Sequence, residues 1–424
     1  MRVALRPLRI RGFPHLAAAN VLNELGNWLG EIALAVLVFD QTGDPLAVMA
    51  LFLAIQFLPA FLAPPLVARL EAFSSRASLA GIYAAEGAAF GVLGLLSGNF
   101  VLALVVALAA IDGALASSAR ALTRGAAGTI LTPRGLLREG NALLNVGFTA
   151  SAAIGPAIAG LLVAGAGVEV ALYADAGSFL CVALLMAVAP GLPRAEPAAA
   201  QWVERLKEGF RYVRERPVLQ RLISAQGAAF VFFYVVIAIE VVFAKETLDA
   251  GDAGYGALLA SWGAGMVAGG LLFAALRRLS LGALLAFSTL AIGASYLGTA
   301  AAPTLLVACL AAAIGGTGNG VQWVALLSAV QEMTETPYQA RVISMLESIA
   351  SAAPGVGFVI GGVVAAALSP RASYAVAGLG VLAVLSVAGV ALRRTGWRGD
   401  ESVADVQVDV AEAPAPPRTT LAPP

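Results

Sequence analysis

Long apolar stretches alternate with short polar gaps along almost the whole chain, and this pattern predicts twelve membrane-spanning helices. Each stretch is close to the ~20 residues that an α-helix needs to cross the hydrocarbon core of a bilayer. The predicted spans are residues 14–38, 45–69, 77–97, 100–122, 142–165, 170–190, 219–244, 253–275, 279–299, 303–325, 343–367 and 372–392. The sequence therefore predicts an all-α membrane protein.

The basic residues between the spans are distributed unevenly. When the gaps are numbered in order, every one of the 26 Lys and Arg residues except Lys245 and Arg371 falls in a tail or an even-numbered gap. Basic residues accumulate on the cytoplasmic side of membrane proteins, so both termini are predicted to be cytoplasmic. Arginine far outnumbers lysine, and Ala and Gly are abundant, which is typical of GC-rich bacteria. We therefore expect a multi-pass protein of the bacterial plasma (inner) membrane.

One long polar stretch divides the spans into two groups of six. We predict an N-terminal bundle over residues 1–190, a cytoplasmic linker over 191–218, a C-terminal bundle over 219–393 and a disordered cytoplasmic tail over 394–424.

Two further patterns support this organisation. SAAIGPAIAG at 151–160 is echoed by SAAPGVGFVIGG at 351–362, which favours duplicated, pseudo-symmetric halves. Within the linker, apolar residues from Trp202 to Val213 recur at helical spacing, which predicts a helix at the membrane surface that tethers the bundles.

Composition agrees with a membrane protein and excludes other classes. Hydrophobic residues make up 59% of the chain and charged residues 12%, with a mean hydropathy of +0.85, whereas soluble domains are about 45–50% apolar. No basic cluster resembles a nucleic-acid patch, so no nucleic-acid partner is expected. Cys181 and Cys309 lie inside spans, and His15 is the sole histidine. No metal, cofactor or enzymatic activity is therefore expected.

The first span carries a stripe of polar residues. Asn20, Asn23, Glu24, Asn27 and Glu31 fall within an arc of about 100° on a helix. A carboxylate at mid-membrane costs on the order of 2.5–3.5 kcal/mol, so the stripe is expected to face a water-filled cavity. The alternative is that the asparagines only form hydrogen bonds between helices.

Other acids lie inside the spans, at Glu86, Asp112, Asp175 and Glu240, and Glu347 lies near a span end. No Lys or Arg is expected at the depth of Glu24, Glu86 and Asp112. A buried carboxyl group without a basic partner favours its neutral form and can therefore carry a proton. This favours proton coupling, with sodium as the alternative ion.

Several motifs resemble the major facilitator superfamily, and in particular its bacterial efflux branch, which includes macrolide and enterobactin exporters. The stretches that carry the resemblance are LLREGNALLN at 136–145, GPAIAGLL in the fifth span, ALYADAGSFL in the sixth, LKEGFRYVRERPVLQRL at 206–222 and YGALLASWGAGMVAGGLL at 255–272. Their order and spacing extend the resemblance from about residue 12 to residue 393.

The resemblance implies two six-helix bundles around a central cavity, lined mainly by spans 1, 4, 7 and 10, that works by alternating access. It makes Glu24, Glu31 and Asp112 candidates for proton coupling. The substrate-cavity candidates are Asn20, Asn23, Asn27, Gln56, Glu240, Asn319, Gln322 and Trp323, with Phe57, Tyr234 and Trp262 as further aromatic residues. Structural or gating candidates are Glu71, Arg76, Arg120, Gly155, Pro156, Asp175 and Arg341.

The loop between the second and third spans departs from the superfamily pattern. That pattern is G-x-L-A-D-R-x-x-R-R, whereas this chain has LVARLEAFSSR at 66–76, with Glu71 in place of the acid and Arg76 as the last base. Ser118 also stands where the family's fourth span has proline. The resemblance therefore implies a weakened conformational latch.

We predict proton-coupled efflux, by antiport, of an amphipathic small molecule such as a drug, a macrolide-like or a siderophore-like compound. The alternatives are uptake or facilitated diffusion of a metabolite, and a transport-inactive scaffold or sensor. The expected partners are the substrate, protons or sodium, and the lipid bilayer, and the protein is expected to be a monomer.

Overall fold

The computed structural model describes residues 5–70, 72–192, 202–276 and 278–393. Within these ranges it contains 12 helices that are long and apolar enough to cross a membrane, and no strand. The prediction of an all-α protein with twelve spans is confirmed. The predicted disordered tail, 394–424, lies outside the described residues.

The first six spans come from the N-terminal part of the chain, and the second of them is interrupted by a π-helical turn. The elements are η1 (Arg6–Arg9), α1 (Phe13–Thr42), α2 (Pro45–Phe52), the π turn η2 (Leu53–Phe57), α3 (Pro59–Leu70), α4 (Ser75–Leu96), α5 (Leu102–Leu131), η3 (Thr132–Arg134), α6 (Leu137–Ala166) and α7 (Val168–Val188).

The remaining six spans follow a short connecting helix, α8 (Trp202–Arg214), which lies within the predicted linker. The elements are α9 (Pro217–Ile237), α10 (Glu240–Val242), the π turn η5 (Phe243–Thr247), α11 (Gly251–Ala275), α12 (Leu281–Ala301), α13 (Leu305–Glu332), α14 (Thr336–Ala367) and α15 (Pro370–Arg393).

Polar side chains at the starts of several spans satisfy the free N–H groups of the first helical turn. Asp44 accepts a hydrogen bond from the Leu46 N–H at 2.8 Å, and Ser280 accepts one from the Ala283 N–H at 3.2 Å. Such caps replace the missing backbone acceptors. The apolar runs between the caps then continue as helix.

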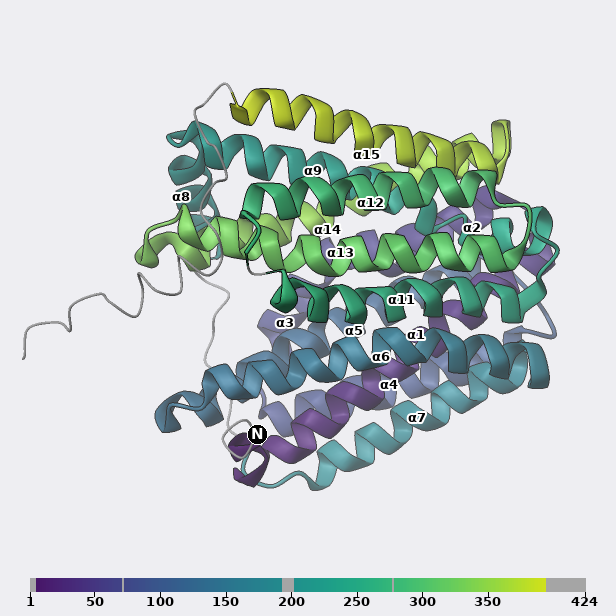
Figure 1. The fold of residues 1–424 in the computed structure, drawn as a ribbon. Coiled ribbons are helices and arrows are strands. Elements are labelled where there is room, and N and C mark those ends of the chain that lie inside the picture. Colours follow the sequence, from purple (N-terminus) through teal and green to yellow (C-terminus); the bar gives the residue numbers. More distant parts are fainter. Residues whose placement is uncertain (1–4, 71, 193–201, 277, 394–424) are drawn as a thin grey trace, which may run out of the picture.

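Most of the helices from α1 to α7 lie in the lower half of Figure 1 and α9 to α15 in the upper half, whereas α2 appears among the C-terminal helices. The N-terminal segment, α8 and the end of α15 share one end of the bundle (Figure 1). We call it the basic end because Arg76, Arg138, Arg216 and Arg341 lie at or near the starts of α4, α6, α9 and α14. The other end is called the opposite end. The proposed division into bundles 1–190 and 219–393 stays a prediction.

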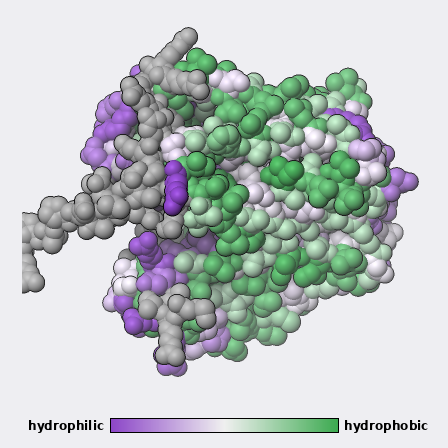
Figure 2. Space-filling view, in the orientation of Figure 1, coloured by the Kyte–Doolittle hydropathy of each residue, from purple (hydrophilic) through white to green (hydrophobic). Residues whose placement is uncertain are grey.

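On the face shown in Figure 2, hydrophobic residues cover the middle of the spans in a broad belt, and hydrophilic residues gather toward the ends. Large apolar side chains point outward from this belt, among them Leu184, Leu271 and Val387. Such exposure would be unfavourable in water but is suited to contact with acyl chains. The protein is a multi-pass membrane protein.

The two groups of helices touch closely along α6 and α11. A Cβ atom on Gly160 would lie 2.7 Å from the Cα atom of Gly256, so the backbones meet where neither residue has a side chain. On the other side of the molecule, α2 meets α14, with the rings of Phe52 and Phe358 5.6 Å apart. Small residues such as Gly160 and Gly256 allow the close approach of α6 to α11.

Candidate functional site

A cavity of 1520 Å³ lies between the two groups of helices. Its lining comes from α1, the interrupted second span, α5, α6, α9, α10, α11, α12 and α14. It extends from Glu240 and Tyr255 to residues near the basic end, including Ala68, Arg124 and Ser348. Sites for drug-sized ligands are about 300–1,000 Å³, so this cavity has room for an organic molecule together with water.

Three residues of the predicted polar stripe line this cavity, namely Glu24, Asn27 and Glu31. They lie on one face of α1 because their spacing follows the helical period. Gln56 lies across from them and its Nε2 donates a hydrogen bond to Glu31 Oε1 at 3.2 Å. All four side chains therefore lie in the wall of this cavity, and their roles stay predictions.

Gln56 belongs to the π turn η2, which ends at Phe57, two residues before Pro59. Proline has no N–H, so Pro59 cannot donate to the carbonyl of Ile55 as a regular helix requires. That carbonyl instead faces Gly113 of α5, where a side chain would collide with it. π turns often occur at functional sites, and this one directs Gln56 toward the cavity.

Arg120 corrects one expectation from the sequence. No base was expected at the depth of Glu24, yet Arg120 Nη1 lies 3.9 Å from Glu24 Oε1. The predicted span ended at residue 122, which placed Arg120 at its cytoplasmic end, whereas α5 continues as a helix to Leu131 and carries Arg120 well inside the helix. Arg120 and Arg124 therefore lie on the helix and line the cavity.

Asp112 and Glu240 contribute two more acids to the cavity wall. Asp112 is 7% exposed, and neither its Oδ1 nor Glu240 Oε2 has a hydrogen-bond partner among the described residues. Glu240 begins α10, after the seventh span breaks at Ile237. Both oxygens are shielded from solvent, so a proton on the carboxyl group itself is the partner that fits without a rearrangement.

Aromatic residues form the wall provided by the C-terminal helices. The ring of Trp262 lies 5.6 Å from that of Tyr296, at an interplanar angle of 8°, and 5.8 Å from that of Phe233. Gly315 and Gly316 on α13 leave room for Trp262, because a Cβ on either would collide with it. The stretch GGTGNG at 315–320 thus supports the aromatic wall by close packing.

Asn20 and Asn23 do not line the cavity. Asn20 Nδ2 donates to the Leu144 carbonyl at 3.3 Å and so joins α1 to α6. Asn23 is 2% exposed, and its Oδ1 has no hydrogen-bond partner in the described part of the chain. For Asn20, the geometry therefore favours the alternative interpretation, in which the side chain forms a hydrogen bond between helices and does not face the cavity.

The expected contribution of the tenth span is also corrected. No residue of α13 lines the cavity, because its glycine face packs on α11, where a Cβ on Gly320 would meet the Met266 carbonyl. Asn319 is half-buried outside the lining. Gln322 donates to Thr289 Oγ1 on α12 at 2.8 Å, and Trp323 is 41% exposed beside Phe230.

Two structural candidates are explained by packing around α1. The carboxylate of Asp175 is fully buried, and a Cβ on Gly26 would lie 2.7 Å from its Oδ1. A Cβ on Gly155 would lie 2.9 Å from Trp28 Cδ1, so α6 rests on Trp28 there. Pro156 follows within α6, and its carbonyl faces Gly256.

The remaining gating candidates lie near the basic end. Arg341 Nε is 2.9 Å from Glu208 Oε2, which connects α14 to α8. Arg76 is exposed at the start of α4, and Glu71 lies outside the described residues.

A contact that the sequence did not reveal joins the helix groups at the opposite end. Lys245 forms an ion pair with Asp40 of α1 and another with Asp252 of α11, at 2.6 Å. Burial alone would lower the pKa of Lys245, but its hydrogen bonds and charge interactions with Asp252 and Asp40 outweigh this, so the pKa is raised. The signal in the sequence was that Lys245 departs from the charge pattern.

Arg371 is the other exception to that pattern, and it too has a structural role. Its Nη1 donates to the Ala300 carbonyl at 2.6 Å, which joins the start of α15 to the end of α12. Both bases at the opposite end are therefore engaged by the protein itself. Arg124, Tyr255 and Tyr296 are further lining residues that were not predicted.

Comparison with known families gives one match that covers nearly all of the chain. Residues 2–411 match the major facilitator family described as transmembrane secretion effector. No curated protein is similar enough in sequence to count as a match.

Solved structures with a similar fold are transporters. The nucleoside transporter NupG has 13% identity and a TM-score of 0.71, with 90% of this chain and 99% of that chain covered. A POT family transporter in complex with 5-aminolevulinic acid has 11% identity and a TM-score of 0.73, with 91% and 96% covered. A bacterial homolog of the human lysosomal transporter Spinster, inward-facing and unoccupied, has 14% identity and a TM-score of 0.67, with 93% and 98% covered. At such identities the likeness establishes the fold.

Proposed function

Because the chain belongs to the transmembrane secretion effector family of the major facilitator superfamily, and is thus a membrane transporter, we propose that it exports an amphipathic small molecule in exchange for protons. The observation that carries this proposal is the central cavity, in which acids from α1, α5 and α10 face an aromatic wall.

The chemistry of the cavity suits an amphipathic substrate. Phe233, Tyr234 and Trp262 offer apolar ring faces, which attract flat or apolar groups and also cations. Glu31 and Glu240 offer carboxylate oxygens next to this wall. A compound with an apolar body and a polar or cationic group would therefore find partners for both parts.

The direction of access supports loading from the cytoplasm. The cavity reaches the basic end, whereas the opposite end is held together by the ion pair of Lys245 with Asp40 and by the close contact of Gly160 with Gly256. We assign the basic end to the cytoplasm because arginines accumulate on that side. The conformation described is then inward-facing.

Protons would be carried by the cavity acids that have no basic partner. Among Glu24, Glu31 and Asp112, only Glu24 has a base within 4 Å in the described part of the chain. In the proposed cycle, the carboxyl groups are protonated from the outside, and this releases the substrate there. The protein then returns to the inward-facing state with these groups protonated. Release of the protons into the cytoplasm prepares the site for the next substrate.

The experiment is a transport assay on a panel of amphipathic compounds in a drug-sensitive host. Cells that express the protein are expected to accumulate less compound, and a proton uncoupler should restore accumulation. Asp112→Asn and Glu31→Gln should each abolish this coupling, whereas Glu169→Gln, which changes an exposed acid away from the cavity, should not.

Four outcomes would overturn parts of the proposal. Increased accumulation of the compound would indicate uptake. Dependence of the flux on a sodium gradient would indicate that sodium, and not the proton, is the coupling ion. If both cavity variants retain coupled flux, the assignment of the proton carriers is wrong. If the wild-type protein moves none of the compounds in cells or in proteoliposomes, the export proposal itself fails.

A further inference from the structure

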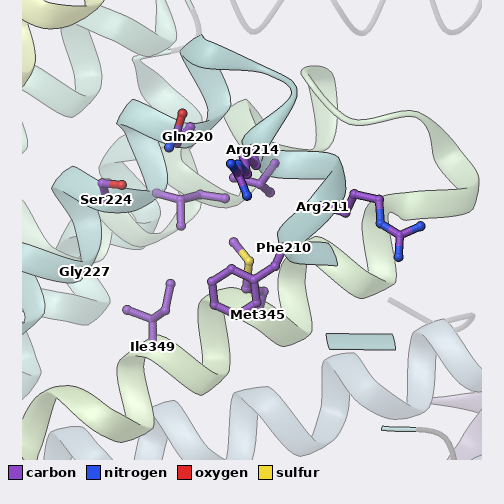
Figure 3. Close-up of a pocket in the computed structure, with 10 residues that line it drawn as sticks. Phe210, Arg211, Arg214, Gln220, Ser224, Gly227, Met345 and Ile349 are labelled. Carbon is purple, nitrogen blue, oxygen red and sulfur yellow. The ribbon is translucent and has the colours of Figure 1, made fainter. Parts of the chain in front are cut away.

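A second cavity, of 630 Å³, lies near the basic end between α8, α9 and α14 (Figure 3). It shares no lining residue with the central cavity. Its wall is largely apolar, with Phe210, Val213, Ile223, Met345 and Ile349. A Cβ on Gly227 would lie 2.9 Å from Ile349 Cγ2, so α9 and α14 close the inner end of this cavity.

The helix α8, which forms one wall, is fixed to the spans by several contacts. The rings of Tyr212 and Tyr338 stack with their centroids 4.3 Å apart. The guanidinium of Arg216 lies 3.4 Å from the centre of the Tyr212 ring and 2.7 Å from Glu335 Oε1. Arg341 also pairs with Glu208. The cavity is therefore part of the folded protein and not a gap beside a loose helix.

Charge is uncompensated at this cavity. Arg216 and Arg341 each pair with an acid, whereas Arg211 and Arg214 form no ion pair within the described ranges. In Figure 3, Arg214 is directed into the cavity beside Gln220, and Arg211 stands at its mouth and points away. One guanidinium, one amide and the hydroxyl of Ser224 thus border a space whose other lining is mainly apolar.

The position of the cavity selects the type of occupant. It lies where the apolar spans give way to the basic end, and α8 is an amphipathic helix with Phe210 53% exposed beside the cavity. Such helices lie at the interface between lipid headgroups and acyl chains. Basic residues there attract anionic lipids of the cytoplasmic leaflet. Free phosphate would satisfy Arg214 but would leave the apolar wall empty.

We propose that this cavity binds an anionic phospholipid of the cytoplasmic leaflet, with its phosphate held by Arg214 and Gln220 and an acyl chain lying along Ile223, Met345 and Ile349. The proposal uses the assignment of the basic end to the cytoplasmic side. It does not depend on the substrate or direction of transport, so it can fail or succeed separately from the proposed function.

Native mass spectrometry of the full-length purified protein tests the proposal with phosphatidylglycerol and phosphatidylethanolamine as probes. The wild-type protein is expected to retain phosphatidylglycerol in preference to phosphatidylethanolamine. Arg214→Gln should weaken this retention roughly fivefold, as expected for the loss of one basic residue at an anionic membrane surface. Ser224→Trp, which fills the cavity without changing charge, should reduce retention of both lipids.

Arg138→Gln is the matched control, because Arg138 is exposed near the same end but lies on α6, away from this cavity. It should leave lipid retention unchanged. Equal losses in Arg138→Gln and Arg214→Gln would indicate general attraction to the charged surface and would overturn the proposal. So would unchanged retention in Ser224→Trp, or displacement of phosphatidylglycerol by millimolar inorganic phosphate alone. Circular dichroism spectra of each variant should match those of the wild type.

Discussion

Arg120 Nη1 lies 3.9 Å from Glu24 Oε1 and so places a base of α5 opposite an acid of α1 in the wall of the central cavity. The Glu24 side chain is 5% exposed, whereas that of Arg120 is 43% exposed. The acid therefore depends on its partner more than the base does. Removal of one member of a buried pair costs more than replacement of both.

This asymmetry makes the first prediction. Arg120→Gln should reduce coupled flux by roughly tenfold or more, because it leaves Glu24 buried without a counter-charge. The double variant Arg120→Gln with Glu24→Gln should recover thermal stability relative to Arg120→Gln alone. The measurements are substrate flux in proteoliposomes and thermal unfolding in detergent. A double variant that is less stable than both single variants would contradict the pairing.

The second prediction concerns Asp40, which belongs to α1 but pairs with Lys245 of the other helix group. Asp40→Asn should weaken closure of the opposite end roughly two- to fivefold, the effect of a partly exposed ion pair. Asp252→Asn is the control, because Asp252 and Lys245 belong to the same group. Spin labels at Gly43 and Asp249 would report the separation of the groups. A longer distance in Asp252→Asn but not in Asp40→Asn would contradict this role.

The third prediction concerns pH. The pKa of Lys245 is raised above 10.5, so its ion pairs are fully present below that value and are lost only as the pH rises through the raised pKa. The distance between the labels at the opposite end should therefore stay constant between about pH 6 and 9. Any pH dependence of flux in this range should come from the cavity acids and should become flatter in Asp112→Asn. If the opposite end opens in this pH range, the assignment of the pH response to the cavity acids is wrong.

The fourth prediction tests the contact of α6 with α11. In Gly256→Ala the new Cβ would lie 2.7 Å from Gly160 Cα and 2.8 Å from the Pro156 carbonyl, so the helices must separate. Overpacking of this kind costs about 1–3 kcal/mol, and both the unfolding temperature and the flux should fall. Gly270→Ala, on the same helix, has no atom within 4 Å of its new Cβ and should behave like the wild type. Similar behaviour of the two variants would show that the contact is not tight.

The fold was predictable because lipid imposes a strict rule on the backbone. Every N–H and C=O group in the hydrocarbon must be bonded within the segment, so each apolar run of sufficient length becomes a helix. The positions of Glu24, Asn27 and Glu31 also followed from one helical period. These features depend on local sequence alone.

The features that escaped prediction depend on how helices meet. Gln322 was expected in the cavity, but the glycines of α13 turn that helix toward α11 and leave Gln322 to bond with Thr289. Arg120 was placed at the cytoplasmic end of the fourth span, because the end of a span is poorly marked where small apolar residues continue. Lys245 and Arg371 were visible only as exceptions to the charge pattern, and their partners required the three-dimensional structure.

The meeting of Gly160 and Gly256 has a mechanical consequence. Two backbones that touch without intervening side chains can roll on each other while no rotamer has to change. If the two groups tilt about this contact, a small angle there would give a larger displacement at the mouth of the cavity, because the contact lies away from the basic end.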